Sequence, residues 1–217
     1  MICRFFDIIF SFFALLLLSP VLVVVIIILK LSGEGEVLFR QERVGKEMKI
    51  FQLLKFATMK KNSPFEGAGE ITVLNDPRVL PVGKFLRKSK LNEIPQLLNV
   101  IKGEMSLVGP RPLTPNTFNF YSSEARKVIC STRPGITGVA SILFRDEEQI
   151  FSKGKDPSTV YAEEIAPKKQ ALEVWWVKNG NIYMYLSVIL CTAVAVLLPK
   201  SSFSFWLFTS MNPGVPR

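Results

Sequence analysis

The clearest structural signals in this chain lie in the stretch Ser89-Lys-Leu-Asn-Glu-Ile-Pro-Gln-Leu-Leu-Asn-Val-Ile-Lys-Gly-Glu-Met-Ser-Leu-Val-Gly-Pro-Arg-Pro112. Its apolar residues recur at helical spacing, which predicts a helix over residues 89–102 that is ended by the next glycine. Pro95 fits such a helix only in the first turn, where no intrahelical donor is required, so we expect Asn92 at or near the N-cap. Two prolines flank Arg111 and restrict its backbone, so its guanidinium is suited to grip a phosphate.

Basic side chains gather around the start of this predicted helix. A helix N-terminus presents free N–H groups and a positive dipole end, which favour an anionic phosphate, and Arg87 comes just before it. Arg133, in Arg133-Pro-Gly-Ile-Thr-Gly138, repeats the arginine and proline pattern less specifically. Two plainer interpretations stay open: a solvated basic face around Arg87, and a rigid turn that merely exposes Arg111.

Composition restricts the chemistry that is open to this protein. The 217 residues include no histidine, which excludes Ser-His-Asp and Cys-His nucleophile systems and histidine-ligated zinc, so carboxylates, lysines and arginines must carry any chemistry. Three widely spaced cysteines indicate neither a disulfide framework nor a metal site. The net charge of +9 favours anionic partners, and a hydrophobic content of 48% with a mean hydropathy of +0.28 indicates a globular domain attached to a membrane.

An apolar run from Ile8 to Leu29 has about the length of 20 residues that a helix needs to cross a bilayer. A straight transmembrane anchor is one interpretation. Ser19-Pro20 lies near the middle of the run, where proline kinks or breaks a helix, so a re-entrant hairpin that enters and leaves on one face is the other. No small-residue cleavage site follows the run. The basic residues beyond it place the main body in the cytoplasm.

The remaining patterns indicate an α/β fold that is mixed and mostly helical. Alternating residues over 36–59 predict strands, and residues 61–72 have the composition of a loop. Helices are predicted over 118–128 and 162–177, while the apolar run 186–198 is short for a membrane span. We therefore divide the chain into an N-terminal membrane hairpin (1–30), a small cytoplasmic domain with amphipathic interface helices (31–185) and an apolar, interfacial C-terminal segment (186–217).

Four motifs together resemble the bacterial sugar transferase family, also called monotopic phosphoglycosyl transferases. They are Leu86 to Pro112, Arg133 to Gly138, Lys55-Phe-Ala-Thr-Met59 and Ser19-Pro20, and the likeness extends over residues 1–180. The resemblance implies transfer of a sugar 1-phosphate from a nucleoside diphosphate sugar, usually a UDP-sugar, to polyprenol phosphate, with Mg²⁺ as cofactor and release of UMP. It also implies a re-entrant helix broken at Ser-Pro, a monotopic location on the cytoplasmic face of the bacterial inner membrane, and a role in initiating exopolysaccharide or other surface glycan synthesis.

The family's catalytic pair is Asp-Glu, and this chain has Asn92-Glu93 at that position. An amide is a poor nucleophile and brings no charge for Mg²⁺, although Asn and Asp are nearly equal as N-caps. Asn in place of Asp at this position therefore changes the chemistry strongly and the structure little. The resemblance implies that Glu93 is the Mg²⁺ ligand and that Arg87 and Arg111 bind phosphate. Glu173 is a weaker candidate for a residue near the site, because the family more often has Asp at this position. Lys55 and Arg133 are weaker candidates for binding phosphate, and Asp146 is a further acid to consider.

Four explanations stay open for Asn92. Glu93 could attack in its place, or Glu93 could act as base and metal ligand while polyprenol phosphate attacks the diphosphate directly. Asp146 or the two acids after it could supply the missing carboxylate. Lastly, activity could be lost, which would leave a catalytically silent membrane scaffold. The expected partners are polyprenol phosphate, a UDP-sugar and membrane phospholipid; a homodimer stays open, and charge alone gives no ground for nucleic acid.

Overall fold

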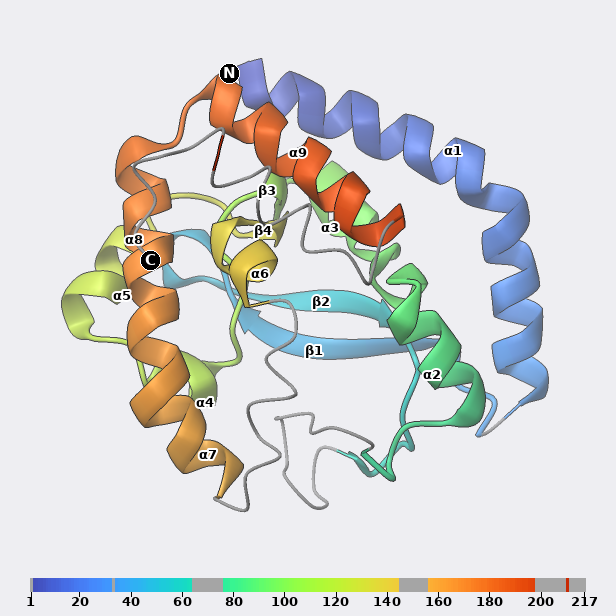
Figure 1. Ribbon diagram of the computed structural model, residues 1–217. Coiled ribbons are helices and arrows are strands. Elements are labelled where there is room, and N and C mark those ends of the chain that lie inside the picture. Colours follow the sequence, from blue (N-terminus) through green and yellow to red (C-terminus); the bar gives the residue numbers. More distant parts are fainter. Residues whose placement is uncertain (1, 33, 64–75, 145–155, 198–209, 211–217) are drawn as a thin grey trace.

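The computed structural model describes residues 2–32, 34–63, 76–144, 156–197 and 210, and these form a mixed α/β fold that is mostly helical, as the sequence predicts. Figure 1 shows two small sheets surrounded by helices, with α1 arching around the outside. The strands and helices are α1 (Ile2–Leu31), β1 (Leu38–Val44), β2 (Ile50–Phe56), α2 (Pro81–Lys88), α3 (Gln96–Lys102), β3 (Ser106–Val108), α4 (Pro115–Phe118), α5 (Ser123–Ile129), β4 (Gly135–Thr137), α6 (Val139–Leu143), α7 (Pro157–Val160), α8 (Ala166–Asn179) and α9 (Ile182–Leu197).

The hairpin of β1 and β2 confirms the strands predicted over 36–59. The two strands are antiparallel, in a register that runs from Leu38 opposite Phe56 to Val44 opposite Ile50. Alternation turns Phe51 and Leu53 of β2 to one face, where they pack in a buried cluster with residues at the end of α3. The hairpin therefore forms the platform on which α3 lies.

Asn99 of α3 supplies hydrogen bonds to the edge of β2 that β1 leaves free. Its side chain is fully buried; the amide oxygen accepts from the N–H of Leu54 at 3.0 Å, and the amide nitrogen donates to the carbonyl of Gln52 at 2.8 Å and to Glu104 at 2.7 Å. One side chain thus takes the place of a third strand.

Replacement of Asn99 by Leu is expected to destabilise the fold by about 3 kcal/mol, because it leaves two buried backbone groups of β2 without partners. The measurement is thermal unfolding of the purified protein. The exposed Asn179, replaced in the same way, serves as the control and should change stability little. Equal melting temperatures for the two variants would contradict the role given to Asn99.

Gly109, Gly135 and Gly138 allow the backbone after β3 to lie directly against the backbone of β4 in a glycine crossing. β3 and β4 pair in parallel, the N–H of Gly109 donates to Thr137, and the N–H of Gly135 donates to Pro110. A Cβ on Gly135 would lie 2.1 Å from the nitrogen of Gly109, and one on Gly138 would lie 2.3 Å from the carbonyl oxygen of Gly109. No residue larger than glycine fits without moving this backbone, so the crossing sets where the chain leaves β3 toward Arg111.

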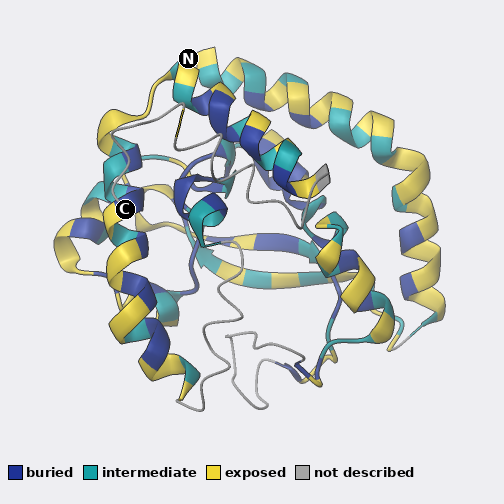
Figure 2. Ribbon diagram, in the orientation of Figure 1, coloured by how far each residue is buried: buried dark blue, intermediate teal, exposed yellow. Residues whose placement is uncertain are grey.

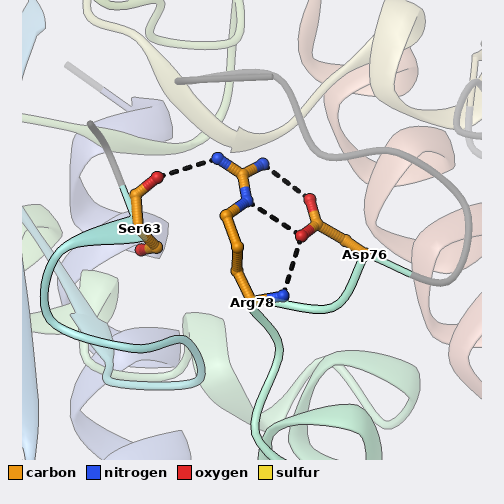
Figure 3. A network of polar contacts seen from close by, with 3 residues as sticks. All are labelled: Ser63, Asp76 and Arg78. Carbon is orange, nitrogen blue, oxygen red and sulfur yellow. Dashed lines mark hydrogen bonds and ion pairs between the residues drawn. The ribbon is translucent and has the colours of Figure 1, made fainter. Parts of the chain in front are cut away.

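A buried ion pair fixes the chain where it enters α2 (Figure 3). The guanidinium of Arg78 binds both carboxylate oxygens of Asp76, at 2.8 and 2.6 Å, and also the carbonyl of Ser63 at 2.8 Å. The same carboxylate accepts from the backbone N–H of Arg78 at 3.0 Å, a local bond that is typical of a turn begun by aspartate. These bonds join the two ends of the segment 64–75, which lies outside the described residues.

Helix α1 is continuous from Ile2 to Leu31 and contains Pro20. Proline has no N–H to donate to the carbonyl of Leu16, and the hydroxyl of Ser19 donates to that carbonyl instead, at 2.7 Å. Figure 1 shows α1 changing direction partway along its length. The break expected at Ser19-Pro20 is thus replaced by a bend within one helix, because a side chain restores the lost hydrogen bond.

Both ends of α1 contact the same globular body. Near its start, Arg4 donates to carbonyls at the end of α3, and Asp7 accepts from β3 and α9. Near its end, Val25 and Leu29 pack against β2 and α2. Between these contacts most of its apolar side chains are exposed (Figure 2), and by length and composition α1 could cross a membrane.

The C-terminal apolar run is part of the core. Helix α9 begins at Ile182, so the boundary expected between residues 185 and 186 falls inside it. Tyr185, Val188 and Cys191 lie on one face and pack in a buried cluster with residues of α6 and α8. The run is short because it forms a core helix, and the tail expected to lie at an interface is outside the described residues.

Candidate active site

The segment around Asn92 folds differently from the predicted single helix. A short 3-10 turn covers Leu91–Glu93, and α3 begins only at Gln96, with Pro95 as its N-cap. The residue before the turn, Lys90, has a left-handed conformation with φ of 59°. The expectation that Asn92 caps the helix is therefore wrong: Pro95 has no N–H to continue a ladder back through the turn, so the α-helix begins after it.

Asn92 turns its side chain inward. The residue is 7% exposed, and its amide oxygen is buried without a hydrogen-bond partner among the described residues. A buried oxygen of this kind costs free energy unless water, an ion or a ligand pairs with it. This orphaned oxygen stands directly beside Glu93 in the sequence, at the position where the resemblance places the chemistry.

Glu93 and Arg111 form the central ion pair. An oxygen of Glu93 lies 3.4 Å from a guanidinium nitrogen of Arg111, and the Glu93 side chain is 14% exposed. Burial alone would raise the pKa of Glu93, but the charges of Arg111, Lys55 and Lys90 outweigh it and hold the pKa at about 2. Glu93 is therefore an anion at every physiological pH.

Lys55 on β2 belongs to the same group of charges. Its side chain is half-buried, and burial followed by repulsion from Arg43, Arg111 and Arg87 lowers its pKa to about 7. The fold thus brings Lys55 of β2 together with three predicted residues of the motif Leu86 to Pro112, namely Arg87, Glu93 and Arg111. Apart from Glu93 their charges are positive, which suits an anionic ligand with more than one charge.

Glu173 of α8 holds Arg111 from the other side. Its carboxylate accepts from the backbone N–H of Arg111 at 3.0 Å, and the residue is 2% exposed. Burial raises the pKa of Glu173 to about 7, although the hydrogen bond from the Arg111 N–H and the charge of Lys169 act to lower it. Its second oxygen has no hydrogen-bond partner among the described residues. Glu173 therefore positions the backbone of Arg111 and leaves its guanidinium to Glu93.

Arg133 does not join this group. Its guanidinium donates to the carbonyl of Gly103 at 2.8 Å, at the C-terminal end of α3, whereas Glu93 precedes the N-terminal end of that helix. Its backbone carbonyl does lie close to Gly109 in the glycine crossing. The Arg-Pro-Gly motif thus supports the loop of Arg111 through its backbone. Asp146 lies outside the described residues.

Sequence reasoning missed Arg43, which holds the far side of the Arg111 loop. This residue of β1 donates to the carbonyl of Pro112 at 3.0 Å and also bonds Gln41. No spacing singled it out among the basic residues that follow the apolar run. Strand pairing alone would not have found it either, because Arg43 lies opposite Phe51, four residues from Lys55 along β2, and its charge nevertheless acts on Lys55.

The donor atoms around Glu93 fit Mg²⁺ as a companion of a diphosphate. Mg²⁺ is usually bound through one or two carboxylates together with substrate phosphates and water, and Glu93 with the orphaned oxygen of Asn92 offers oxygen donors of this kind. Among the described residues no group of three or more Asp, Glu or Cys could hold a metal by itself. The surrounding positive charge also opposes a bare cation, so the metal would be held there only with an anion.

Comparison with known proteins identifies the family of this chain. The family model described as bacterial sugar transferase matches residues 1–199. The exopolysaccharide production protein ExoY of Rhizobium meliloti is 34% identical over 92% of this chain and 87% of its own length. The UDP-glucose:undecaprenyl-phosphate glucose-1-phosphate transferase of Klebsiella pneumoniae is 33% identical, over 92% of this chain and 41% of its own.

The undecaprenyl-phosphate galactose phosphotransferase of Salmonella typhimurium is 30% identical, over 89% of this chain and 40% of its own length. The chain thus spans most of one relative and about two fifths of the other two. With a family match over most of its length, the chain belongs to the bacterial sugar transferase family.

Proposed function

We propose that this protein is a phosphoglycosyl transferase that moves a sugar 1-phosphate from a UDP-sugar to polyprenol phosphate. The observation that carries the proposal is the ion pair of Glu93 and Arg111, flanked by Lys55 and Arg87. Two relatives, 30% and 33% identical, are named as undecaprenyl-phosphate sugar transferases. The positive group suits the diphosphate of the donor and the phosphate of the acceptor, both of which are anions.

We propose direct displacement as the route in this chain. An oxygen of polyprenol phosphate attacks the phosphorus that carries the sugar, the bond from this phosphorus to the bridging oxygen breaks, and its electron pair leaves with UMP. The attacking phosphate is already ionised, so no base is needed, and the protein has to align the two anions and neutralise their charge. Mg²⁺, when bound, would supply further positive charge at the diphosphate.

The chain's own residues have separate tasks in this route. Arg111, with its backbone held by Glu173, presents its guanidinium to the transferred phosphate, and Lys55 adds a second charge. Glu93 keeps Arg111 in place and is a poor nucleophile itself, because a carboxylate whose pKa is held at about 2 by cations binds a further group weakly. Asn92 contributes an oxygen and no charge.

The test is UMP release by the full-length protein in lipid nanodiscs with Mg²⁺ and a panel of UDP-sugars, with and without polyprenol phosphate. Direct displacement predicts UMP only when the acceptor is present and no mass increase of the protein without it. A mass increase of one phosphosugar, lost in Glu93→Gln, would replace this route by attack from Glu93. No UMP with any donor would overturn the function and leave the silent-scaffold interpretation, which Asn92 motivates.

We also propose that α1 is re-entrant and that the protein is monotopic. Polar contacts of Arg4 and Asp7 at one end of α1 and apolar contacts of Val25 and Leu29 at the other are made to the same body. A helix that crossed the bilayer would have to break one of these two sets. A single cysteine placed at residue 2, in a chain freed of its own three cysteines, should be labelled from the same side as the body; labelling from the opposite side would exclude the hairpin.

Binding of a UDP-sugar is expected to weaken as pH rises through about 7. Burial lowers the pKa of Lys55 to about 7, so above this pH the lysine loses the charge that attracts the diphosphate. The diphosphate of a UDP-sugar has no terminal phosphate that titrates in this range. Calorimetry from pH 6 to pH 9 measures the effect. Lys55→Arg, which stays charged throughout, should remove the pH dependence, whereas an equal decline in both proteins would assign it to another group.

A further inference from the structure

Asp7 ties the membrane helix to the strand that leads to Arg111. The residue is 3% exposed, and its carboxylate accepts from the backbone N–H of Leu107 at 2.8 Å, from the hydroxyl of Ser106 at 2.9 Å and from the hydroxyl of Tyr185 at 2.7 Å. Two of these donors belong to β3. An otherwise apolar helix thus uses one of its few charged residues for a buried contact with the strand before the site.

Arg4, one turn earlier, ties the same helix to α3. Its guanidinium donates to the carbonyls of Val100 at 2.7 Å and Ile101 at 3.1 Å, in the last turn of α3. The last carbonyls of a helix lack the usual partner four residues on; that of Val100 also accepts from the N–H of Gly103 at 2.9 Å, and the arginine adds a further donor and compensates the negative end of the helix dipole. The first two turns of α1 therefore hold one end of α3 and one end of β3 at the same time.

The opposite ends of these two elements carry the central ion pair. Glu93 lies just before α3, and Arg111 lies three residues after β3. The backbone from Leu107 to Arg111 is held rigidly. Gly109 and Pro110 form hydrogen bonds with the segment 135–137 across the glycine crossing, and the N–H of Arg111 donates to Glu173. A shift of β3 relative to α3 would therefore change the 3.4 Å contact of Glu93 with Arg111.

We propose that Asp7 is a positioning residue: through β3 it sets the place of Arg111 relative to Glu93, so that the seating of α1 controls the geometry of the site. Figure 1 shows the start of α1 close to the start of α9, where Cys3 and Phe6 pack against the cluster that contains residues of α9, which is the arrangement this link requires. The anchor is in this way a working part of the enzyme. The inference rests on the proposed function for its kinetic readout.

The variant Asp7→Asn in nanodiscs tests the link, with Ser11→Ala as its matched control. Ser11 lies one turn further along the same buried face of α1 and has no hydrogen-bond partner among the described residues. Displacement of a catalytic group by about 1 Å can cost about 100-fold in rate, so we expect Asp7→Asn to lower kcat by about 10- to 100-fold with little change in KM for the UDP-sugar. Ser11→Ala should leave both near the wild-type values.

Two further measurements distinguish positioning of Arg111 from a purely structural role of Asp7. If Asp7 acts through Arg111, Asp7→Asn should lower kcat far less in an Arg111→Lys background than in wild type, so that the two losses of kcat are not additive. Hydrogen exchange should also become faster at the amides of residues 107–111 and stay unchanged in β2. Additive losses, or exchange that rises equally throughout the protein, would overturn the proposal.

The exchange measurement keeps the two proposals separable. If the wild-type protein releases no UMP, the proposed function fails, and faster exchange at residues 107–111 in Asp7→Asn still tests the link. If wild type is active and Asp7→Asn behaves like Ser11→Ala, the link fails and the function stands. Should Asp7→Asn not fold, Ser106→Ala removes one donor and keeps the carboxylate; it should lower kcat in the same direction, and an unchanged kcat would count against the link.

Discussion

Replacing Asn92 by Asp is expected to raise the rate of UMP release by at least about a hundredfold, which corresponds to about 2.7 kcal/mol of transition-state stabilisation. The new carboxylate would lie beside Glu93, where the positive charges of Arg111, Lys55 and Lys90 already hold the pKa of Glu93 at about 2. These charges favour its ionised form despite burial. It would provide the nucleophile that the amide lacks, and a charged metal ligand in place of a neutral oxygen.

The mechanism should change together with the rate. Incubation of the Asn92→Asp variant with a UDP-sugar and no acceptor should release one UMP per protein and increase the protein mass by one phosphosugar. Asn92→Ala, which also removes the amide but adds no carboxylate, is the control and should show neither effect. If Asn92→Asp is no faster than the parent protein and forms no adduct, position 92 takes no part in the chemistry of this chain.

Replacing Arg111 by Ala is expected to lower kcat by about 100- to 1,000-fold, the range found when one group that stabilises transition-state charge is removed. The change takes away the guanidinium that faces Glu93 and leaves that carboxylate without its closest cation. Arg111→Lys keeps the charge but loses the paired geometry, so its kcat should fall between those of wild type and Arg111→Ala. Steady-state kinetics of UMP release measures the series.

Arg133→Ala is the matched control for this prediction, because Arg133 is also followed by a proline but its guanidinium bonds the carbonyl of Gly103. Its removal should lower the stability of the protein. It should leave kcat within about threefold of wild type, because Arg133 is an exposed residue outside the active-site group. A loss of kcat as large as that of Arg111→Ala would return Arg133 to the phosphate site, where the sequence alone had placed it.

Several features could be read from the sequence because local patterns determine them. The strands over 36–59 follow from alternation, and the helix that ends before Gly103 follows from apolar spacing, although it begins at Gln96 and not at Ser89 as the spacing predicted. Arg111 is marked by its two prolines. The absence of histidine restricts the chemistry to carboxylates, lysines and arginines. The resemblance then singled out Asn92, a position that packing barely distinguishes from Asp because the two side chains have nearly the same size and shape.

Other features required the tertiary structure, because they join residues that are distant in the chain. Arg111 and Arg133 share one local pattern, and only the direction of each side chain separates a site residue from a support of α3. The pKa of Lys55 follows from burial beside three arginines, which no local pattern reveals. Asp7 lies 100 residues from Leu107 in sequence and bonds it directly. Local sequence thus determines which elements form and which residue types can do chemistry, whereas packing decides which charges meet, since desolvation and Coulomb energy depend on distance in space.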